Sequence, residues 1–238
     1  MAAKLKYKRI LLKISGEVLE GKLGQGIDFK VLDALCGEIA QVKKIGAEIA
    51  IVVGGGNFWR YRDFKASGLD HVHSDYMGMI STVMNAIAMR HSFRKFGVDA
   101  VALSSFPMEQ VVGPYVRDKA LKYMEDGRIV ICGGGTGNPY FTTDSAAALR
   151  ALELNCNVLL KATKVDYVYD KDPMKFKNAK SYKKISYDEM FRKELGVMDL
   201  SAVDLCAAEK LPIVVFNLTK KGNVAKVVKG EAVGTLIC

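Results

Sequence analysis

Two kinds of hydrophobic pattern alternate along the chain. Short continuous apolar runs occur at 9–14, which ends at Ser15-Gly16, and at 47–53, which leads into Gly54-Gly55-Gly56-Asn57. After Asp28, apolar residues instead recur three or four positions apart, on one face of a helix: Val31, Leu32, Leu35, Ile39 and Val42. These patterns predict two buried strands and, between them, a helix whose N-terminus is capped by Asp28.

The same alternation continues through the rest of the chain. A long helix is predicted from Ser74 to about Lys95, with an apolar surface supplied by Met77, Ile80, Val83, Met84, Ile87 and Met89. Further short apolar runs predict strands at 99–103, 128–132, 157–160 and 212–216. Because continuous apolar strands separated by helices are typical of a parallel sheet covered on both faces, we predict an α/β fold, a three-layer αβα sandwich with a mostly parallel central sheet.

Length and composition fit one domain that spans residues 1–238. Half of the 238 residues are hydrophobic and 26% are charged, which allows a large buried core. No internal repeat or low-complexity linker interrupts the chain. Two smaller lobes divided near residue 160 are the alternative, and the lysine-rich segment 170–184 is the candidate for a mobile flap or a lobe boundary.

The sequence carries no evident targeting, membrane or disulfide signal. Residues 1–8 contain charge but no apolar run long enough for a signal peptide, and apolar stretches such as 50–56 are far shorter than the roughly 20 residues of a membrane span. The five cysteines are scattered and include no Cys-x-x-Cys pair, so reduced thiols are expected rather than a disulfide framework or a zinc site. We therefore expect a cytoplasmic protein without a membrane partner.

The formal charge of +9 predicts attraction to polyanions, and nucleotides satisfy this as well as nucleic acids do. Much of the excess lies at 171–184 and 220–229, and no predicted helix carries a dense stripe of Arg and Lys interleaved with aromatic residues. Specific recognition of nucleic acid is therefore not expected, while weak, salt-sensitive DNA binding stays open.

Glycine-bearing corners follow three of the predicted strands, at 13–16, 54–57 and 133–138. In an open α/β sheet, ligands bind outside the carboxyl ends of the strands, where glycines let backbone N–H groups approach phosphate oxygens closely. Glycine also serves simply to make a tight turn, so one corner alone says little. Three corners with the same placement predict an anion-binding face.

One corner has the spacing of a Walker A loop without its chemistry. Residues Gly16 to Lys22 have the required interval, but Leu23 stands where a Ser or Thr hydroxyl must reach Mg²⁺. Glu17 and Glu20 lie inside the interval, where their charges would oppose a triphosphate. No Gly-x-Gly-x-x-Gly motif occurs either, which removes the main support for a dinucleotide-binding fold.

Lys13 and the segment 138–145 are the strongest candidates for chemistry. Lys13 is the lone charge inside an apolar strand, one residue before the Ser15-Gly16 turn. It either extends to solvent at the strand end or points a positive charge at transferring phosphates. The segment 138–145 precedes a predicted helix, which Thr143 or Asp144 would cap. Its threonines, asparagine and aspartate also suit a phosphate and a base or ribose, and an acid there can orient a lysine from another strand.

Five stretches together resemble the bacterial UMP kinases of the amino acid kinase superfamily, in order and in spacing. They are Gly-Gly-Gly-Asn-Phe-Trp-Arg at 54–60, Asp-Tyr-Met-Gly-Met at 75–79, Gly-Thr-Gly-Asn-Pro-Tyr-Phe-Thr-Thr-Asp-Ser at 135–145, Lys-Ala-Thr-Lys-Val-Asp at 161–166 and Val-Met-Asp-Leu at 197–200. The likeness runs from residue 7 to about 237. It implies an enzyme that transfers the γ-phosphoryl group of ATP to UMP, giving UDP and ADP, in pyrimidine nucleotide biosynthesis.

The resemblance also implies roles for individual residues. Asp144 and Asp199 would keep Lys13 and Lys161 aimed at the transferred phosphoryl group. The implied catalytic residues are Lys13, Arg60, Asp144, Lys161 and Asp199. ATP would be bound by Lys13, Ile14, Ser15, Gly16, Gly56, Arg60, Thr163, Tyr169 and Asp172. UMP would be bound by Gly55, Asp75, Thr136, Gly137, Asn138, Pro139, Tyr140, Phe141, Thr142 and Thr143. From position alone, Asp75 is instead expected to cap the long helix together with Ser74.

The family resemblance further implies Mg²⁺ bound with ATP, a homohexamer, activation by GTP and inhibition by UTP. No Asp/Glu cluster has metal-ligand spacing, so no metal site of the protein's own is expected. The GTP site of the family often includes a histidine and extra arginines. This chain has Arg90, His91, Arg94 and Lys95 in the long helix, so the positive charge is kept in a different arrangement. His71 and His73 lack a third ligand nearby, and Trp59 is expected in core or subunit-interface packing.

Two other classes of protein compete with this interpretation. Another amino acid kinase, such as a carbamate or aspartate kinase, would need a site for a small carboxylate, and the Thr-rich stretch at 136–143 argues against it. A regulatory or nucleic-acid-binding protein built on a kinase fold is favoured only by the +9 charge.

Overall fold

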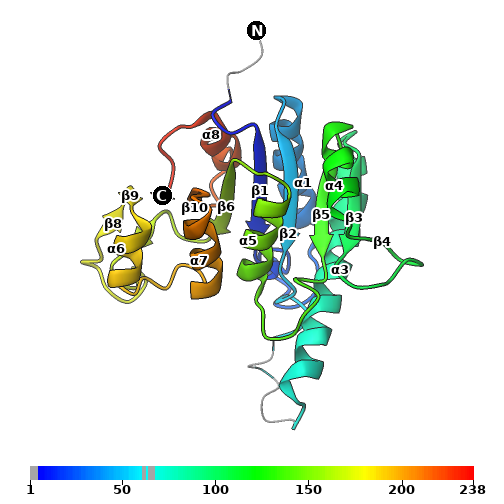
Figure 1. The fold of residues 1–238 in the computed structure, drawn as a ribbon, viewed down its shortest axis with the longest axis horizontal. Helices are drawn as coiled ribbons and strands as arrows, with labels where there is room; N and C mark the ends of the chain where they lie inside the picture. Colours follow the sequence, from blue (N-terminus) through cyan, green and yellow to red (C-terminus); the bar gives the residue numbers. More distant parts are fainter. Residues whose placement is uncertain (1–4, 61–62, 64–67) are drawn as a thin grey trace.

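A nine-stranded sheet forms the centre of the protein in the computed structural model, which describes residues 5–60, 63 and 68–238 (Figure 1). The strand order is β4-β3-β5-β2-β1-β6-β10-β11-β9. The strands are β1 (Arg9–Ile14), β2 (Glu48–Val53), β3 (Ala100–Ser104), β4 (Gly113–Pro114), β5 (Ile129–Gly133), β6 (Val158–Thr163), β9 (Lys184–Ile185), β10 (Ile213–Asn217) and β11 (Thr235–Ile237). Their neighbours pair in parallel, with the exception of the antiparallel pair β10–β11.

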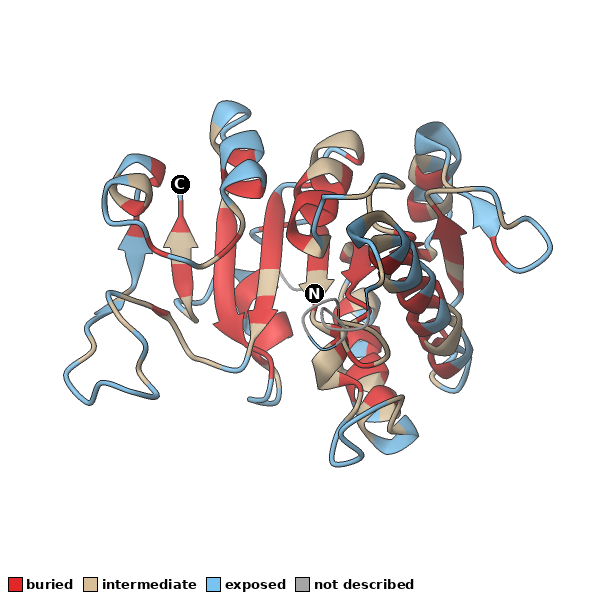
Figure 2. Ribbon diagram, turned by 90° about the horizontal axis from the view of Figure 1, so that it is seen from below, coloured by how far each residue is buried: buried red, intermediate tan, exposed pale blue. Residues whose placement is uncertain are grey.

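Helices cover both faces of this sheet. One layer holds α1 (Phe29–Lys44), α3 (His71–Arg94) and α8 (Asn223–Lys229), and the opposite layer holds α4 (Arg117–Glu125), α5 (Thr143–Glu153), α6 (Tyr187–Arg192) and α7 (Leu200–Ala208). Buried residues concentrate in the strands and on the helix sides that face them (Figure 2). The predicted α/β class, a mostly parallel sheet between helical layers, is confirmed.

The continuous apolar strands are explained by burial on both faces. In β1, Ile10, Leu12 and Ile14 pack into the layer of α1, α3 and α8, whereas Leu11 packs into the layer of α5 and α7. Side chains alternate along a strand, so Lys13 falls on the same face as Leu11, toward α5. The alternation of β1 therefore decides which helix can supply a partner for this lysine.

Three predicted helix starts are tested by the capping contacts. Asp28 caps α1 as predicted, because its side chain accepts hydrogen bonds from the backbone N–H groups of residues 30 and 31. The long helix starts earlier than predicted, at His71, since Asp70 caps it, so the prediction that Asp75 is a cap is wrong. The helix α5 is capped by Thr142, so the prediction of Thr143 or Asp144 as the cap is also wrong. Asp75 and Asp144 therefore have no capping role.

The lysine-rich segment 170–184 contains part of a second, two-stranded antiparallel sheet. It pairs β7 (Val168–Tyr169) with β8 (Ser181–Tyr182), and the backbone N–H of Asp170 donates to the carbonyl of Lys180 at 3.0 Å. Its mobility stays a prediction.

Two findings concern the thiols and the helices of the described part of the chain. Cys36, Cys132, Cys156 and Cys206 are buried free thiols, and Cys238 is an exposed one. No helix described here is long and apolar enough to cross a membrane. Residues 1–4, which belong to the N-terminal segment judged not to be a signal peptide, lie outside the described residues.

Candidate active site

The predicted site residues gather where the parallel strands end. The carboxyl ends of β1, β2, β5 and β6 lie along one edge of the sheet, at the bottom of Figure 1. The central strand β1 lies between β2 and β6, which is where the strand order reverses. In open α/β sheets, such a switch point is the usual place for a ligand. Lys13 and Lys161 are register partners on β1 and β6, so their side chains leave neighbouring strands at the same level.

A buried carboxylate lies between these two lysines. Lys13 Nζ is 2.8 Å from Asp144 Oδ1, and Lys161 Nζ is 2.5 Å from Asp144 Oδ2. Asp144 comes from the first turn of α5, and only 8% of the residue is exposed. The ammonium groups of Lys13 and Lys161, which both contact this carboxylate, would repel each other without a negative charge between them. The cluster as a whole keeps one excess positive charge, which suits an anionic ligand.

The cluster perturbs the ionisation of its members. Burial alone would raise the pKa of Asp144, but the charges of Lys13 and Lys161 outweigh it and hold that pKa below its ordinary value. The pKa of Lys161 is lowered, chiefly by burial, even though Asp144 acts to raise it. Such groups in contact at a strand edge are typical of a functional site.

Asp199 joins the cluster from α7. It stands immediately before the first residue of that helix, and its Oδ2 accepts a hydrogen bond from Thr142 Oγ1, the side chain that caps α5. The pKa of Asp199 is raised, first by burial and then by the negative charge of Asp144. The structure thus brings Lys13, Asp144 and Lys161 into direct contact and connects Asp199 to them through the α5 cap.

Two glycine corners meet next to Lys13. The residues Ile14, Ser15 and Gly16 lead from β1 into the short 3-10 helix η1 (Gly16–Val18), and Gly54 N donates to the carbonyl of Ile14 at 2.9 Å. A Cβ atom on Gly16 would lie 2.5 Å from the carbonyl oxygen of Gly54, which is too close for any side chain to fit here. Glycine is therefore required here by close approach of two backbones.

Arg60 lies on the same side and is held by acidic residues of the neighbouring loop. Its Nε donates to the carbonyl of Gly56 at 2.6 Å, and its Nη2 is 3.4 Å from Glu17 and 3.3 Å from Glu20. The two glutamates that break the Walker-like pattern are thus paired with a cation. An incoming phosphate that binds Arg60 has to compete with these carboxylates.

Three of the residues that the resemblance assigns to ATP, namely Thr163, Tyr169 and Asp172, lie at the end of β6 and on the segment that follows it. The Thr163 hydroxyl donates to a loop carbonyl, that of Val165 at 2.8 Å, at the end of β6. Tyr169 is in β7, and Asp172 accepts from the backbone N–H of Met174 at 2.9 Å within its own turn. Of the three, Thr163 lies nearest along the chain to Lys161, and the contacts found for Asp172 stay within its turn.

The loop predicted to bind UMP is tied to the start of α3. Asp75 Oδ2 accepts a hydrogen bond from the backbone N–H of Tyr140 at 2.7 Å, and Asp75 Oδ1 is 3.4 Å from His71 Nε2. The His71 and Tyr140 rings meet edge to face with centroids 4.9 Å apart. A Cβ on Gly55 would be 2.6 Å from the carbonyl of Gly78 in α3. Asp75 therefore lies where the loop 136–143 meets α3, and Gly55 packs against the same helix.

Within that loop, the remaining predicted residues take different positions. Thr136 Oγ1 accepts from the backbone N–H of Asn138 at 3.1 Å, which closes a small turn. Tyr140 has a φ of 68° and is 68% exposed, and Phe141 is also exposed. The stretch therefore presents polar groups and two exposed rings beside the cluster, while Gly137, Pro139, Thr142 and Thr143 complete the path to α5.

Sequence reasoning missed the side chains that support these loops from behind. Asn57 and Asn85 exchange amide hydrogen bonds of 3.0 and 2.7 Å, and Asn85 also donates to the carbonyl of Gly54 at 2.8 Å. Thr82 Oγ1 accepts from the backbone N–H of Gly134 at 2.7 Å. The one available signal was polar residues within the apolar pattern of the long helix, where Asn85 and Thr82 are now buried.

The site has no metal cage in the part of the chain that the structure describes, because no three His, Cys, Asp or Glu side chains there are grouped to hold an ion. His71 and His73 contact different carboxylates, those of Asp75 and Asp70. Of the acids in and beside the site, Asp144 and Glu20 are paired with Lys and Arg, and Asp199 accepts a hydrogen bond from Thr142.

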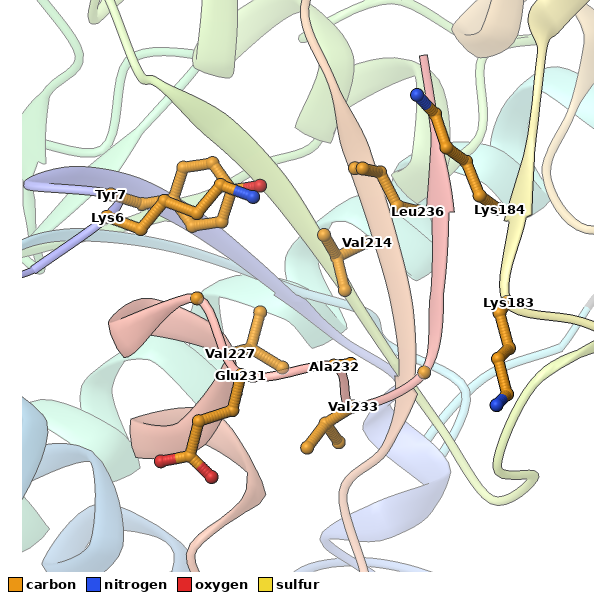
Figure 3. Close-up of a pocket in the computed structure, with 12 residues that line it drawn as sticks. Lys6, Tyr7, Lys183, Lys184, Val214, Val227, Glu231, Ala232, Val233 and Leu236 are labelled. Atoms are coloured by element: carbon orange, nitrogen blue, oxygen red, sulfur yellow. The ribbon is translucent and has the colours of Figure 1, made fainter.

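Cavities also lie outside this cluster. A cavity of about 190 Å³ lies between the N-terminal segment and β11 (Figure 3), where the ammonium groups of Lys183 and Lys184 point in opposite directions, so its charges do not converge on a ligand. A larger one, of about 1090 Å³, opens beside η1 and is lined by Glu17, Lys164, Leu218, Thr219 and Gly222, among others. The larger cavity adjoins the Thr163 loop.

Comparison with known proteins identifies the class. Residues 8–217 match the amino acid kinase family. The chain is 49% identical over 234 residues to uridylate kinase PUMPKIN, chloroplastic, from Arabidopsis thaliana, covering 98% of this chain and 69% of that protein. It is 36% identical to the solved UMP kinase from Bacillus anthracis, with a TM-score of 0.94 and coverage of 97% of this chain and 96% of that chain. It is 33% identical to the solved UMP kinase from Ureaplasma parvum, with a TM-score of 0.92 and coverage of 98% of this chain and 99% of that chain.

Two lysines held by an acid at the switch point of a parallel sheet suit an α/β protein that binds phosphate groups. Together with the family match, this places the protein plainly: the chain belongs to the amino acid kinase family, whose members are kinases.

Proposed function

We propose that this protein is a UMP kinase, which transfers the γ-phosphoryl group of ATP to UMP and yields ADP and UDP in pyrimidine nucleotide biosynthesis. The observation that carries the proposal is the Lys13–Asp144–Lys161 cluster, which lies between the loops at 14–16 and 54–60 on one side and the loop 136–143 on the other. Relatives of 33–49% identity are named UMP or uridylate kinases.

The cluster supplies the electrostatics that phosphoryl transfer needs. Negative charge is spread over the transferred group in the transition state, and fixed positive charges stabilise it without having to reorganise. Lys13 and Lys161 provide those charges, and Asp144 holds both ammonium groups in place. Asp199 restrains the start of α5 through Thr142 and acts on the lysines from a second side.

The donor nucleotide is assigned to the side of β1, β2 and η1. Backbone N–H groups of 14–16 and Gly56 approach the phosphates, and Arg60 exchanges its glutamate partners for them. Adenosine is assigned to Thr163, Tyr169 and Asp172 on the family resemblance. The cavity of about 1090 Å³ is lined by Lys164 and by none of these three residues, so it does not define the adenosine site. Mg²⁺ would come bound to ATP and neutralise phosphate charge.

The acceptor nucleotide is assigned to the loop 136–143 with Gly55 and Asp75. The carboxylate of Asp75 faces this loop and accepts hydrogen bonds, so it suits the hydroxyl groups of a ribose. Because that carboxylate now accepts the N–H of Tyr140, a sugar that binds it either shares Asp75 with the loop or displaces the loop. The exposed rings of Tyr140 and Phe141 supply apolar surface beside it.

Self-association as a homohexamer also belongs to the proposal. The helix α3 leaves Tyr76, Met77, Ile80 and Met84 between 39% and 45% exposed. Exposed apolar side chains along one helix are typical of an interface. The chain 1–238 would act as one domain in each subunit, since a single sheet carries both sides of the site.

The remaining expectations rest on family resemblance or, for the location, on the sequence signals alone. They are activation by GTP, inhibition by UTP, a cytoplasmic location and the bacterial type of the enzyme. The similarity to enzymes of Bacillus anthracis and Ureaplasma parvum supports the bacterial type, whereas the similar Arabidopsis protein is named as chloroplastic.

An ADP-coupled assay with a panel of acceptors tests the proposal. The panel contains UMP, CMP, AMP, aspartate, glutamate and carbamate, each with ATP and Mg²⁺. We expect ADP formation with UMP at a kcat/KM well above that of the other acceptors. Preference for a small acid would assign the chain to another branch of the family. The absence of turnover with every acceptor would favour a regulatory protein built on the kinase fold.

A further inference from the structure

A buried charged network lies behind the loop 136–143, on residues that have no place in the site described above. Its centre is Arg150 of α5, which is 5% exposed. The guanidinium donates from Nη1 to Glu153 Oε2 at 2.5 Å and from Nη2 to Ser105 Oγ at 3.0 Å, and it stacks on the ring of Tyr115 at 3.9 Å. Tyr115 also donates its hydroxyl to Glu153, at 2.8 Å. Such a network holds each member in one orientation.

The direction of the hydrogen bonds at Ser105 follows from the chemistry of arginine. A guanidinium has donors and no acceptor, so Ser105 Oγ has to accept from Arg150. The single hydroxyl hydrogen of Ser105 is then available for a carbonyl. Gly133 O already accepts from the backbone N–H of Ser105 at 3.2 Å, and Gly135 O lies closer to the hydroxyl, at 2.7 Å. Arg150 thereby directs the Ser105 hydroxyl toward the carbonyl of Gly135.

This contact determines the orientation of one peptide group in the loop. In a planar trans peptide the C=O and the following N–H point in opposite directions. With Gly135 C=O turned toward Ser105, the N–H of Thr136 points away from the buried network. From residue 135 onward the loop is partly or fully exposed, so that N–H is directed toward the accessible side.

The loop needs such support because its own backbone is permissive. Gly134, Gly135 and Gly137 have φ values of 78°, 58° and 87°, a conformation that glycine adopts freely and leaves just as freely. A Cβ on Gly137 would lie 3.0 Å from the carbonyl oxygen of Ser105, so the two segments are already in close contact. Side chains from outside the loop therefore decide which of its conformations is populated.

We propose that Ser105 and Arg150 are positioning residues for the acceptor nucleotide, acting by fixing the peptide between Gly135 and Thr136 so that its N–H faces the ligand. The proposal rests on the assignment of the loop 136–143 to UMP. Neither side chain touches the substrate. Loss of either one lets the glycine loop sample other conformations, and binding of UMP has to restore the ordered one, which raises KM for UMP without a matching effect on ATP.

Ser105→Ala tests this, with Ser92→Ala as the matched control. Ser92 is a buried serine whose hydroxyl donates to Asp33 at 2.7 Å, near the far end of α3. Steady-state kinetics should show KM for UMP raised roughly three- to tenfold in Ser105→Ala, the range for one lost hydrogen bond, while KM for ATP stays within a factor of two. Ser92→Ala should change neither KM. Equal increases in both KM values, or an unchanged KM for UMP, would overturn the proposal.

Arg150→Lys gives a second, independent arm. Lysine keeps the charge near Glu153, but it lacks the planar fork that reaches Glu153 and Ser105 at once. It should raise KM for UMP alone, and the double variant with Ser105→Ala should be no worse than the more affected single variant, since both changes act on the same peptide. Additive effects would show that Arg150 does not act through Ser105. A wild type that does not phosphorylate UMP would refute the proposed function itself. A wild type that does so, with a KM for UMP that the variants leave unchanged, would refute only the positioning roles of Ser105 and Arg150.

Discussion

Asp144→Asn is the most informative single substitution, because it removes charge from the site and changes almost nothing else. The side chains of Lys13 and Lys161 are each 12% exposed, and Asp144 separates their ammonium groups at 2.8 and 2.5 Å. Asparagine keeps the shape but leaves two neighbouring positive charges without a counterion. Breaking a buried ion pair in this way costs about 3–5 kcal/mol of unfolding free energy. Because Thr142 caps α5, none of this loss comes from the helix cap.

A loss of that size is measurable without unfolding the protein at room temperature. For a chain of this length, each kcal/mol lowers Tm by about 2–4 °C, so a decrease on the order of 10 °C is expected. Asp126→Asn is the matched control, because Asp126 pairs with Lys122 at 2.7 Å on the surface. It should leave both Tm and kcat close to those of the wild type.

The effect on catalysis has its own signature. Misplacing a charge that stabilises the transition state lowers kcat by about 10²–10³-fold, while KM for UMP should change far less. Burial lowers the pKa of Lys161 and Asp144 counteracts it, so removing Asp144 lowers that pKa further. The alkaline decline of kcat should therefore begin at lower pH in the variant than in the wild type.

Stability at acid pH gives a second comparison. The pKa of Asp144 is lowered in the folded protein, so its contribution to stability is present above the unfolded pKa of about 3.9 and is lost as pH falls through the folded value. The wild type should lose this contribution on acidification, and Asp144→Asn should not. An Asn variant that keeps kcat within about threefold, with the alkaline decline unmoved, would refute the orienting role of Asp144.

Three further substitutions address the two nucleotide sides. Lys13→Met keeps the length and apolar stem of the side chain but removes its charge, so kcat should fall by about 10²–10³-fold with the fold retained by circular dichroism; an active variant would remove Lys13 from the mechanism. Asp75→Ala should narrow the preference for UMP over dUMP in kcat/KM, because a carboxylate that accepts from a ribose hydroxyl rejects a sugar without one; an unchanged ratio would exclude ribose contact. Glu20→Gln removes one of the two carboxylates paired with Arg60, so KM for ATP should fall by up to about fivefold, the worth of a surface ion pair, and a rise would show that Glu20 instead helps to bind ATP.

Local patterns in the sequence determined most of the secondary structure near the site. Continuous apolar runs indicated β1, β2, β5, β6 and β10 because strands buried on both faces need no polar alternation. Glycines after β1, β2 and β5 indicated the ligand-binding edge, because parallel strands bring their carboxyl ends together. Helix starts were less secure: Asp28 was found, but Asp70 was passed over for Ser74 and Asp75, because all three are residue types that cap helices and they stand close together around the start of α3.

Apart from the family resemblance, only the tertiary structure shows which charges meet. Nothing near Lys13 in the sequence shows that Asp144 and Lys161 surround it, because the three residues come from β1, α5 and β6 and meet only through the strand register. In the same way, the sequence indicated that the charges of Glu17 and Glu20 would repel a phosphate, whereas the structure shows both paired with Arg60. No sequence pattern indicated the contact of Arg150 with Ser105. Apolar periodicity is a property of neighbouring residues, whereas ion pairs and hydrogen bonds depend on the distance between elements that the sequence keeps far apart.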